Sequence, residues 1–199
     1  MSWAAAFLIL VTIAFSVTPA PSEGASEAAV LRAFIASLPP ASRRVLRLSW
    51  RSTNATTSGG RSSHCAFLGV QCTATGAVAA VNLSGAGLSG SLTASAPRLC
   101  ALPALAVLDL SRNRFTGPVP AALTACSVVS ALLLSGNLLT GAVPPELLSS
   151  RQLRKVDLSY NTLAGEISGS GSPVIEYLDL SVNMLSGTIP PDLAALPSL

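Results

Sequence analysis

The chain has 199 residues, half of them hydrophobic and 11% charged, with a formal net charge of +3, and this length suits one ordinary domain. Between residues 25 and 77 there are six arginines and one glutamate, whereas six basic and seven acidic residues follow from residue 78 onward. The arginines are scattered among serines, so we interpret them as a solvated face, with an acidic partner or a membrane surface as the alternative. We expect no nucleic-acid partner.

Residues 1–24 have the pattern of a secretory signal peptide. Residues 4–17 form an apolar run of 14 residues, which is too short for a comfortable transmembrane span. Small residues follow the run, as a cleavage region requires: Ala20, Ser22, Gly24 and Ala25. We therefore expect the chain to enter the secretory pathway.

Two short helices are expected next. Ser26 can cap the first helix, with Glu27 in its first turn, and Pro39 and Pro40 end it. Its apolar face follows helical spacing and consists of Val30, Leu31, Phe34, Ile35 and Leu38. The second helix, Ser42 to Trp50, places Val45, Leu46 and Trp50 on a common side. A Ser-, Thr- and Gly-rich loop follows from residue 51 to 63, and it contains an N-glycosylation sequon at Asn54.

The four cysteines fit an oxidising compartment. Cys65 and Cys72 lie close together in HCAFLGVQC, and we expect them to form a disulfide. His64 is the one histidine of the chain. A Cys–His nucleophilic pair needs a free thiol, and zinc needs about four ligands, so we expect neither a catalytic residue nor a metal or cofactor site.

A stretch of 13 residues recurs five times, starting at Val78, Leu105, Val129, Leu153 and Ile175, in steps of 27, 24, 24 and 22 residues. These steps, with the pattern L-x-x-L-x-L-x-x-N-x-L, predict a leucine-rich-repeat solenoid of the α/β class. Residues 78–199 hold five repeats, and Leu199 is the first position of a sixth. We therefore expect an N-terminal part of a longer product, or a truncated gene model.

Each repeat has positions that face inward and positions that face outward. In the second repeat, the leucines at 105, 108 and 110 should point into the core of a short strand, and Val107, Asp109, Ser111 and Arg112 should face the concave side. A row of asparagines should turn inward and bond unpaired backbone groups: Asn113, Asn137, Asn161 and Asn183. Ala86 replaces asparagine in the first repeat, so this ladder should be interrupted there.

Two features do not belong to the common repeat pattern: a pair of cysteines and the altered end of the fourth repeat. Cys100 and Cys126 precede successive repeats, and we interpret them as small buried apolar residues, with a disulfide between neighbouring coils as the alternative. The element L-x-G-x-[VI]-P closes the second, third and fifth repeats, but the fourth has Glu166-Ile167-Ser168 and then a Gly- and Ser-rich run. We expect a loose convex side in the fourth coil.

The concave face holds the candidate ligand-binding residues, because tyrosine and arginine are common interface anchors. These are Arg112, Lys155, Asp157, Tyr160, Tyr177 and Asp179. The alternative is an ordinary solvated surface on which the recurring aspartates bond their neighbours. A second sequon begins at Asn82, where a glycan would cover the first coil.

The motif C-x-F-x-G-V-x-C at residues 65–72 resembles the N-terminal cap of plant leucine-rich-repeat proteins, with Phe67 where that family usually has tryptophan. The L-x-G-x-[VI]-P element resembles the plant-specific subclass of these repeats. The resemblance covers residues 26–199, and it implies a right-handed superhelix with a parallel β-sheet on the concave face and a second short strand in each coil. It also implies a helical, disulfide-pinned cap over residues 25–77.

The cap and repeats together resemble the N-terminal part of the ectodomain of plant leucine-rich-repeat receptor-like kinases. The resemblance implies a non-enzymatic module for a peptide or protein ligand, with a co-receptor as a further partner. The full-length product would then lie on the outer face of the plasma membrane, anchored by a transmembrane segment beyond this chain. Two alternatives remain: a secreted protein similar to polygalacturonase inhibitors, or a scaffold or decoy without a ligand of its own.

Overall fold

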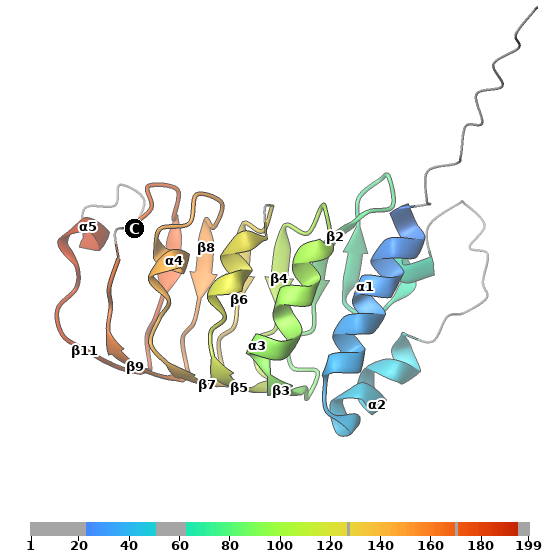
Figure 1. The fold of residues 1–199 in the computed structure, drawn as a ribbon, viewed down its shortest axis with the longest axis horizontal. Coiled ribbons are helices and arrows are strands. Elements are labelled where there is room, and N and C mark those ends of the chain that lie inside the picture. The colour runs from blue at the N-terminus through green and yellow to red at the C-terminus, as the bar shows by residue number, and fades with distance from the viewer. Residues whose placement is uncertain (1–22, 51–62, 127, 170, 195–199) are drawn as a thin grey trace, which may run out of the picture.

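The computed structural model describes residues 23–50, 63–126, 128–169 and 171–194. Most of the predicted signal peptide, the sequon at Asn54 and the start of a sixth repeat at Leu199 lie outside the described residues. Within them the predicted solenoid is confirmed: successive coils stack side by side along one axis, with the helical cap at one end (Figure 1). In the part of the chain that the structure describes, no helix is long and apolar enough to cross a membrane.

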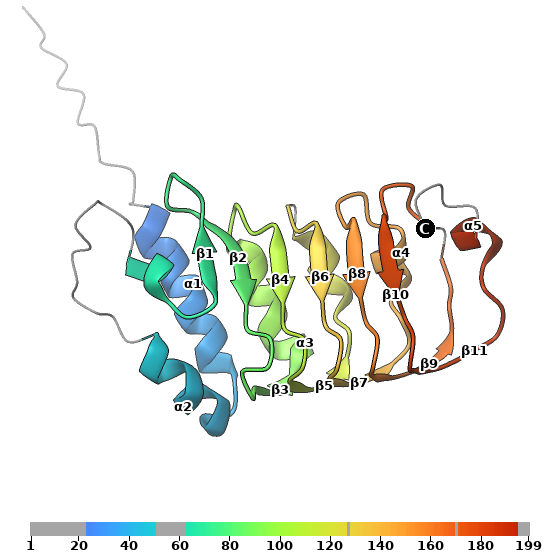
Figure 2. The same cartoon turned by 180° about the vertical axis from the view of Figure 1, so that it is seen from behind.

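Two sheets run along the solenoid, one strand from each coil (Figure 2). The first contains, in spatial order, β1 (Val70–Cys72), β2 (Val78–Asn82), β4 (Val107–Asp109), β6 (Ala131–Leu133), β8 (Lys155–Asp157) and β10 (Tyr177–Asp179). The second contains β3 (Ser89–Ser91), β5 (Arg114–Pro118), β7 (Leu138–Gly141), β9 (Thr162–Glu166) and β11 (Met184–Ser186). All pairs are parallel except β1 with β2, which is antiparallel. Strand β1 was not predicted from the sequence.

The convex side carries short helices that return the chain from the second sheet to the first. They are α3 (Leu92–Ser95) with η2 (Ala96–Ala101), η3 (Ala121–Ala125), α4 (Pro145–Leu148) and α5 (Pro191–Ala194). Between the coils the inward leucines form one continuous core, and Leu105, Leu108 and Leu110 are fully buried. The alternation of apolar and polar residues in each strand therefore decides which face of the sheet is packed.

The cap begins with α1 (Glu23–Ser37) and α2 (Pro40–Ser49), and the second starts two residues before the predicted position because Pro40 can occupy the first turn of a helix. Leu46 and Trp50 are buried one turn apart. Val45 is 47% exposed, so the prediction that it shares their face was wrong. A residue next to Leu46 is rotated by roughly a quarter turn or more around the helix, and it points to solvent here.

The two expected irregularities have different outcomes. Cys100 and Cys126 form a disulfide between coils, so their interpretation as unpaired buried residues was wrong; neighbouring coils bring their Cα atoms to 4.5 Å, within bridging distance. The fourth coil has no helix among the described residues between β9 and β10. Its connection is nevertheless anchored, because the Ser172 amide donates to the Leu148 carbonyl at 2.7 Å.

The asparagine positions bond the neighbouring coil, and always the preceding one. Asn137 donates to the carbonyls of Leu110 and Leu134, at 3.0 and 2.9 Å, and its Oδ1 accepts the Phe115 amide at 3.0 Å. Asn113, Asn161 and Asn183 repeat this arrangement. Ala86 therefore leaves no gap in the ladder, because the coil before it is the cap strand β1, whose antiparallel pairing differs.

Candidate functional site

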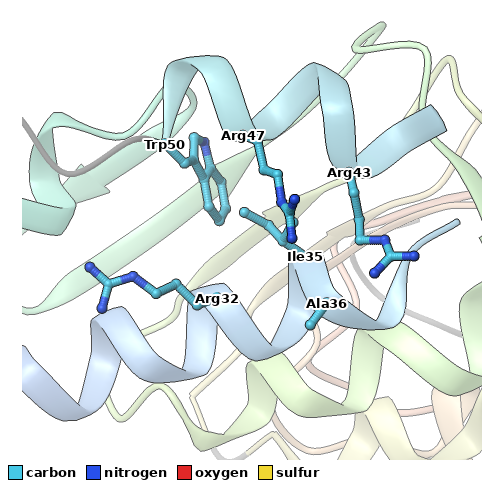
Figure 3. Close-up of a pocket in the computed structure, with 6 residues that line it drawn as sticks. All are labelled: Arg32, Ile35, Ala36, Arg43, Arg47 and Trp50. Atoms are coloured by element: carbon cyan, nitrogen blue, oxygen red, sulfur yellow. The ribbon is translucent and has the colours of Figure 1, made fainter. Parts of the chain in front are cut away.

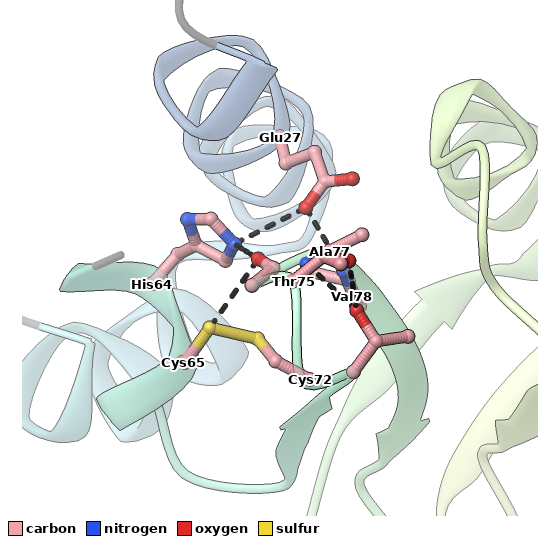
Figure 4. Close-up of a disulfide and its surroundings, with 9 residues drawn as sticks. Glu27, His64, Cys65, Cys72, Thr75, Ala77 and Val78 are labelled. Carbon is pink, nitrogen blue, oxygen red and sulfur yellow. Dashed lines mark hydrogen bonds and ion pairs between the residues drawn. A yellow bond between two sulfur atoms is a disulfide. The ribbon is translucent and has the colours of Figure 1, made fainter. Parts of the chain in front are cut away.

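The cap contains a buried acid–histidine pair that was not predicted from the sequence. His64, from η1 (Ser63–Ala66), is fully buried, and Glu27 is 3% exposed. The His64 Nε2 atom lies 3.1 Å from both Glu27 Oε2 and the Gly76 carbonyl (Figure 4). Both neighbours are acceptors, so Nε2 carries the hydrogen and donates to them.

This pair stands beside the Cys65–Cys72 disulfide. His64 and the two sulfur atoms lie within 4.8 Å of one another, but sulfurs joined in a disulfide are not thiolates and do not bind metal as thiolates do. Glu27 Oε2 also accepts the Val78 amide at 2.9 Å, where the first repeat starts. The pair therefore joins the cap to the first coil, and it is a structural group.

The predicted concave residues separate into two neighbouring groups. A hollow of about 500 Å³ is lined by Arg112, Ser135, Gly136, Asp157, Ser159 and Tyr160. Of the predicted residues it brings together Arg112, Asp157 and Tyr160, which we call the Arg112 group. Tyr160 is 63% exposed. Sequence reasoning missed Ser135 and Gly136 as lining residues, although they occupy the same repeat positions as Ser111 and Arg112.

Lys155, Tyr177 and Asp179 form the second set, the Lys155 group, on β8 and β10. Lys155 and Tyr177 are partners in the strand register, and the Lys155 ammonium lies 4.8 Å from the centre of the Tyr177 ring, a cation–π geometry. The Tyr177 hydroxyl donates to Asp179 Oδ2 at 3.3 Å. Asp179 in turn is the register partner of Asp157, so the two groups are continuous.

The electrostatics of the Lys155 group keep Tyr177 a hydrogen-bond donor. Partial desolvation and the carboxylates of Asp179 and Asp157 raise the pKa of Tyr177. The Ser181 hydroxyl and then the Ser181 amide lower the pKa of Asp179. The Lys155 group thus offers one ammonium, one aromatic hydroxyl and the carboxylate of Asp179, which stays ionised at neutral pH, a set suited to polar recognition rather than to acid–base chemistry.

The recurring aspartates have a structural role as well. Asp109 Oδ1 accepts the Ser111 amide at 2.9 Å and its hydroxyl at 2.6 Å, and Asp157 holds Ser159 in the same way. Ser111 and Ser159 are buried. The Ser111 hydroxyl also pairs with that of Ser84 at 2.8 Å, so it is covered by its neighbours and offers little surface to a ligand.

The residue before each asparagine position has a left-handed backbone. Gly85 and Gly136 adopt φ of 65° and 64°, but Arg112, Tyr160 and Val182 adopt 54°, 52° and 52°. In the first four coils this conformation points the amide at the next coil; the Arg112 amide, for example, donates to the Ser135 carbonyl at 2.7 Å. Residues other than glycine are strained there, by about 1–2 kcal/mol, so the large side chains of the Arg112 group are presented at a cost in stability.

Replacing Val182 with asparagine is expected to raise the free energy of unfolding by about 0.5–1 kcal/mol, because asparagine tolerates this backbone better than a β-branched residue. Val182 is 60% exposed, so little packing is lost. Urea unfolding followed by circular dichroism measures the change. Gly136→Val introduces a β-branched residue at the same repeat position and should lower the free energy of unfolding. A lower free energy of unfolding in the Val182→Asn variant would contradict the proposed backbone strain.

Comparison with known proteins shows what this arrangement is similar to. The Leucine Rich Repeat family model matches residues 104–126 and 174–196. A leucine-rich repeat receptor-like serine/threonine-protein kinase of Arabidopsis thaliana is 38% identical over 65 residues, which are 33% of this chain and 6% of that kinase. The chain thus matches a small part of its curated relatives.

Solved structures match over most of the chain. The BIR2 ectodomain from Arabidopsis thaliana is 30% identical at a TM-score of 0.70, covering 87% of this chain and 88% of that one. The Arabidopsis receptor kinase HAESA, solved in complex with the peptide hormone IDA and the co-receptor SERK1, is 28% identical at a TM-score of 0.63. That match covers 87% of this chain and 32% of HAESA.

Proposed function

Because this chain belongs to the leucine-rich-repeat ectodomains of plant receptor kinases, we propose that it is a non-enzymatic recognition module that binds a peptide or protein ligand on its concave face. The observation that carries the proposal is the continuous surface of the Arg112 and Lys155 groups. Its aromatic side chains are exposed, with Tyr160 at 63% and Tyr177 at 43%, and tyrosine and arginine are enriched among the residues that contribute most to binding.

We further propose the organisation of the product. Residues 1–24 are a signal peptide, residues 25–77 a cap and residues 78–199 the repeats, which places the module outside the cell. The antiparallel pairing of β1 with β2, followed by parallel pairing alone, supports this boundary. Asn54 and Asn82 carry glycans in this proposal. A membrane anchor and a kinase domain would follow the ectodomain, and a co-receptor is a second partner.

The ligand is also expected to avoid the first coil. Asn82 is exposed at the end of β2, where its Oδ1 accepts the Ser84 amide at 3.1 Å. A glycan there would cover the neighbouring concave strands, and Arg112 lies one coil away, whereas the Lys155 group lies three to four coils further along the sheet. The Lys155 group, with Asp157 and Tyr160, therefore stays open in a glycosylated chain.

The test is capture of secreted plant peptides on the immobilised, secreted chain, followed by synthesis and titration of the retained peptide. Lys155→Glu and Tyr177→Ala are each expected to weaken binding by at least about tenfold, since the loss of an interface hot spot costs about 2 kcal/mol or more and about 1.4 kcal/mol is tenfold. Arg98→Glu is the control, because Arg98 is exposed on η2 at the convex side. Unchanged affinity in both concave variants would remove these coils from the site.

A further inference from the structure

A second cavity lies in the cap, between α1 and α2. Its volume is about 440 Å³, and its lining residues are Arg32, Ile35, Ala36, Arg43, Arg47 and Trp50 (Figure 3). Arg32 comes from α1, whereas Arg43 and Arg47 lie one turn apart on α2. The sequence pattern indicates arginines scattered over a solvated face in this region. Three of them instead line one cavity.

These three arginines lack acidic partners among the described residues. The ion pairs of the described chain are His64 with Glu27 and Arg154 with Glu176. Glu27 is the one acidic residue between residues 25 and 77, and it is buried against His64 and the Val78 amide. It cannot neutralise the cavity, so none of the described carboxylates compensates the positive charge of the three guanidinium groups.

One donor of the cavity is also unsatisfied. The Arg43 Nε atom is buried and has no hydrogen-bond partner in the described structure. A buried donor without an acceptor costs about 1–3 kcal/mol. An acceptor that entered the cavity would remove this cost, and guanidinium groups bind oxyanions through charge-assisted bonds in a fixed fork geometry.

The floor of the cavity is apolar and fixed. Ile35 is 7% and Trp50 is 4% exposed. The Trp50 indole donates to the Leu68 carbonyl at 2.9 Å and stacks on Phe67 with ring centres 5.2 Å apart. Trp50 therefore holds one orientation, and it gives the hollow an apolar base under a rim of positive charge.

We propose that this cavity binds a tetrahedral oxyanion ester, a sulfate or phosphate group carried on a partly apolar ligand. Such a group offers three acceptor oxygens, as a phosphate ester does, and it can engage more than one guanidinium at once, whereas a carboxylate offers two. The apolar carrier would lie on Ile35 and Trp50. The site is on the cap helices rather than on the concave sheet, so it goes beyond the proposed function and can fail or hold independently of it.

The test is isothermal titration of the secreted chain with phenyl sulfate and phenyl phosphate at constant ionic strength, with benzyl alcohol as the uncharged probe. We expect saturable binding of at least one ester, and the tighter one identifies the source. Arg43→Gln and Arg47→Gln should each weaken it by at least about tenfold, the loss of about one charge-assisted hydrogen bond. Arg44→Gln should change it by less than about twofold, because Arg44 is exposed on the same helix and does not line the cavity.

Two results would overturn the proposal. Equal weakening by all three glutamine variants would indicate diffuse attraction to a basic helix. The other is the absence of saturable binding of both esters to the parent chain, in a preparation whose circular dichroism shows that it is folded. This result would show that the cavity binds neither ester.

Discussion

Replacing His64 with alanine is expected to lower the free energy of unfolding by about 3–5 kcal/mol, because breaking a buried pair leaves an uncompensated polar partner in the core. Glu27 would keep the Val78 amide as its one described partner, and the space of a fully buried imidazole would be empty. Since the pair joins the cap to the first coil, the loss should appear as early unfolding of the cap. Urea denaturation followed by Trp50 fluorescence measures it.

The comparison that isolates the pair is a double-mutant cycle with Glu27→Gln, which keeps the shape and an acceptor for Val78 but removes the carboxylate. In that background His64→Ala should cost less, by about 1 kcal/mol or more. Equal costs in both backgrounds would mean that His64 contributes packing alone and that the contact with Glu27 adds nothing.

Replacing Asn137 with alanine is expected to cost about 3 kcal/mol. The substitution leaves the Phe115 amide buried without a partner, which costs about 1–3 kcal/mol. It also removes one bond each from the Leu110 and Leu134 carbonyls, at about 0.5–1.5 kcal/mol each, although Asn113 and Asn161 still donate to them. Asn137→Asp is nearly the same size but loses both N–H donors, so it should be at least as harmful. Thermal and urea unfolding measure both variants.

Asn183→Ala provides the matched comparison, because Asn183 makes equivalent bonds in a coil that is only partly buried. Its cost should be smaller than that of Asn137→Ala, since water can replace the lost partner. A cost for Asn183→Ala equal to or above that of Asn137→Ala would show that burial does not set the value of the ladder.

Features that repeat were readable from the sequence. The period of the leucines fixed which side chains enter the core, and Leu105, Leu108 and Leu110 are buried as predicted. The asparagine row was predicted for the same reason, because each copy of the motif faces the same backbone geometry. Such signals accumulate over five coils, so a single irregular copy does not hide them.

Features that depend on one packing event were not readable. Glu27 lies in α1 and His64 in η1, far apart in the sequence, and neither belongs to a periodic pattern. The gathering of Arg32, Arg43 and Arg47 depends on how α1 and α2 cross, and spacing within one helix does not state that. The Cys100–Cys126 bridge required the distance between two coils, which the sequence left open as an alternative.

The asparagine bonds also make each coil depend on the coil that is synthesised after it. Each coil obtains the acceptor for its buried amide from the coil that follows it, as the Leu88 amide does from Asn113 and the Leu139 amide from Asn161. A ribosome adds about 5–20 residues per second, so a coil waits on the order of seconds for its successor. During that interval the apolar end of its core is uncovered, and we expect chaperones to bind the growing chain at its most recently made coil.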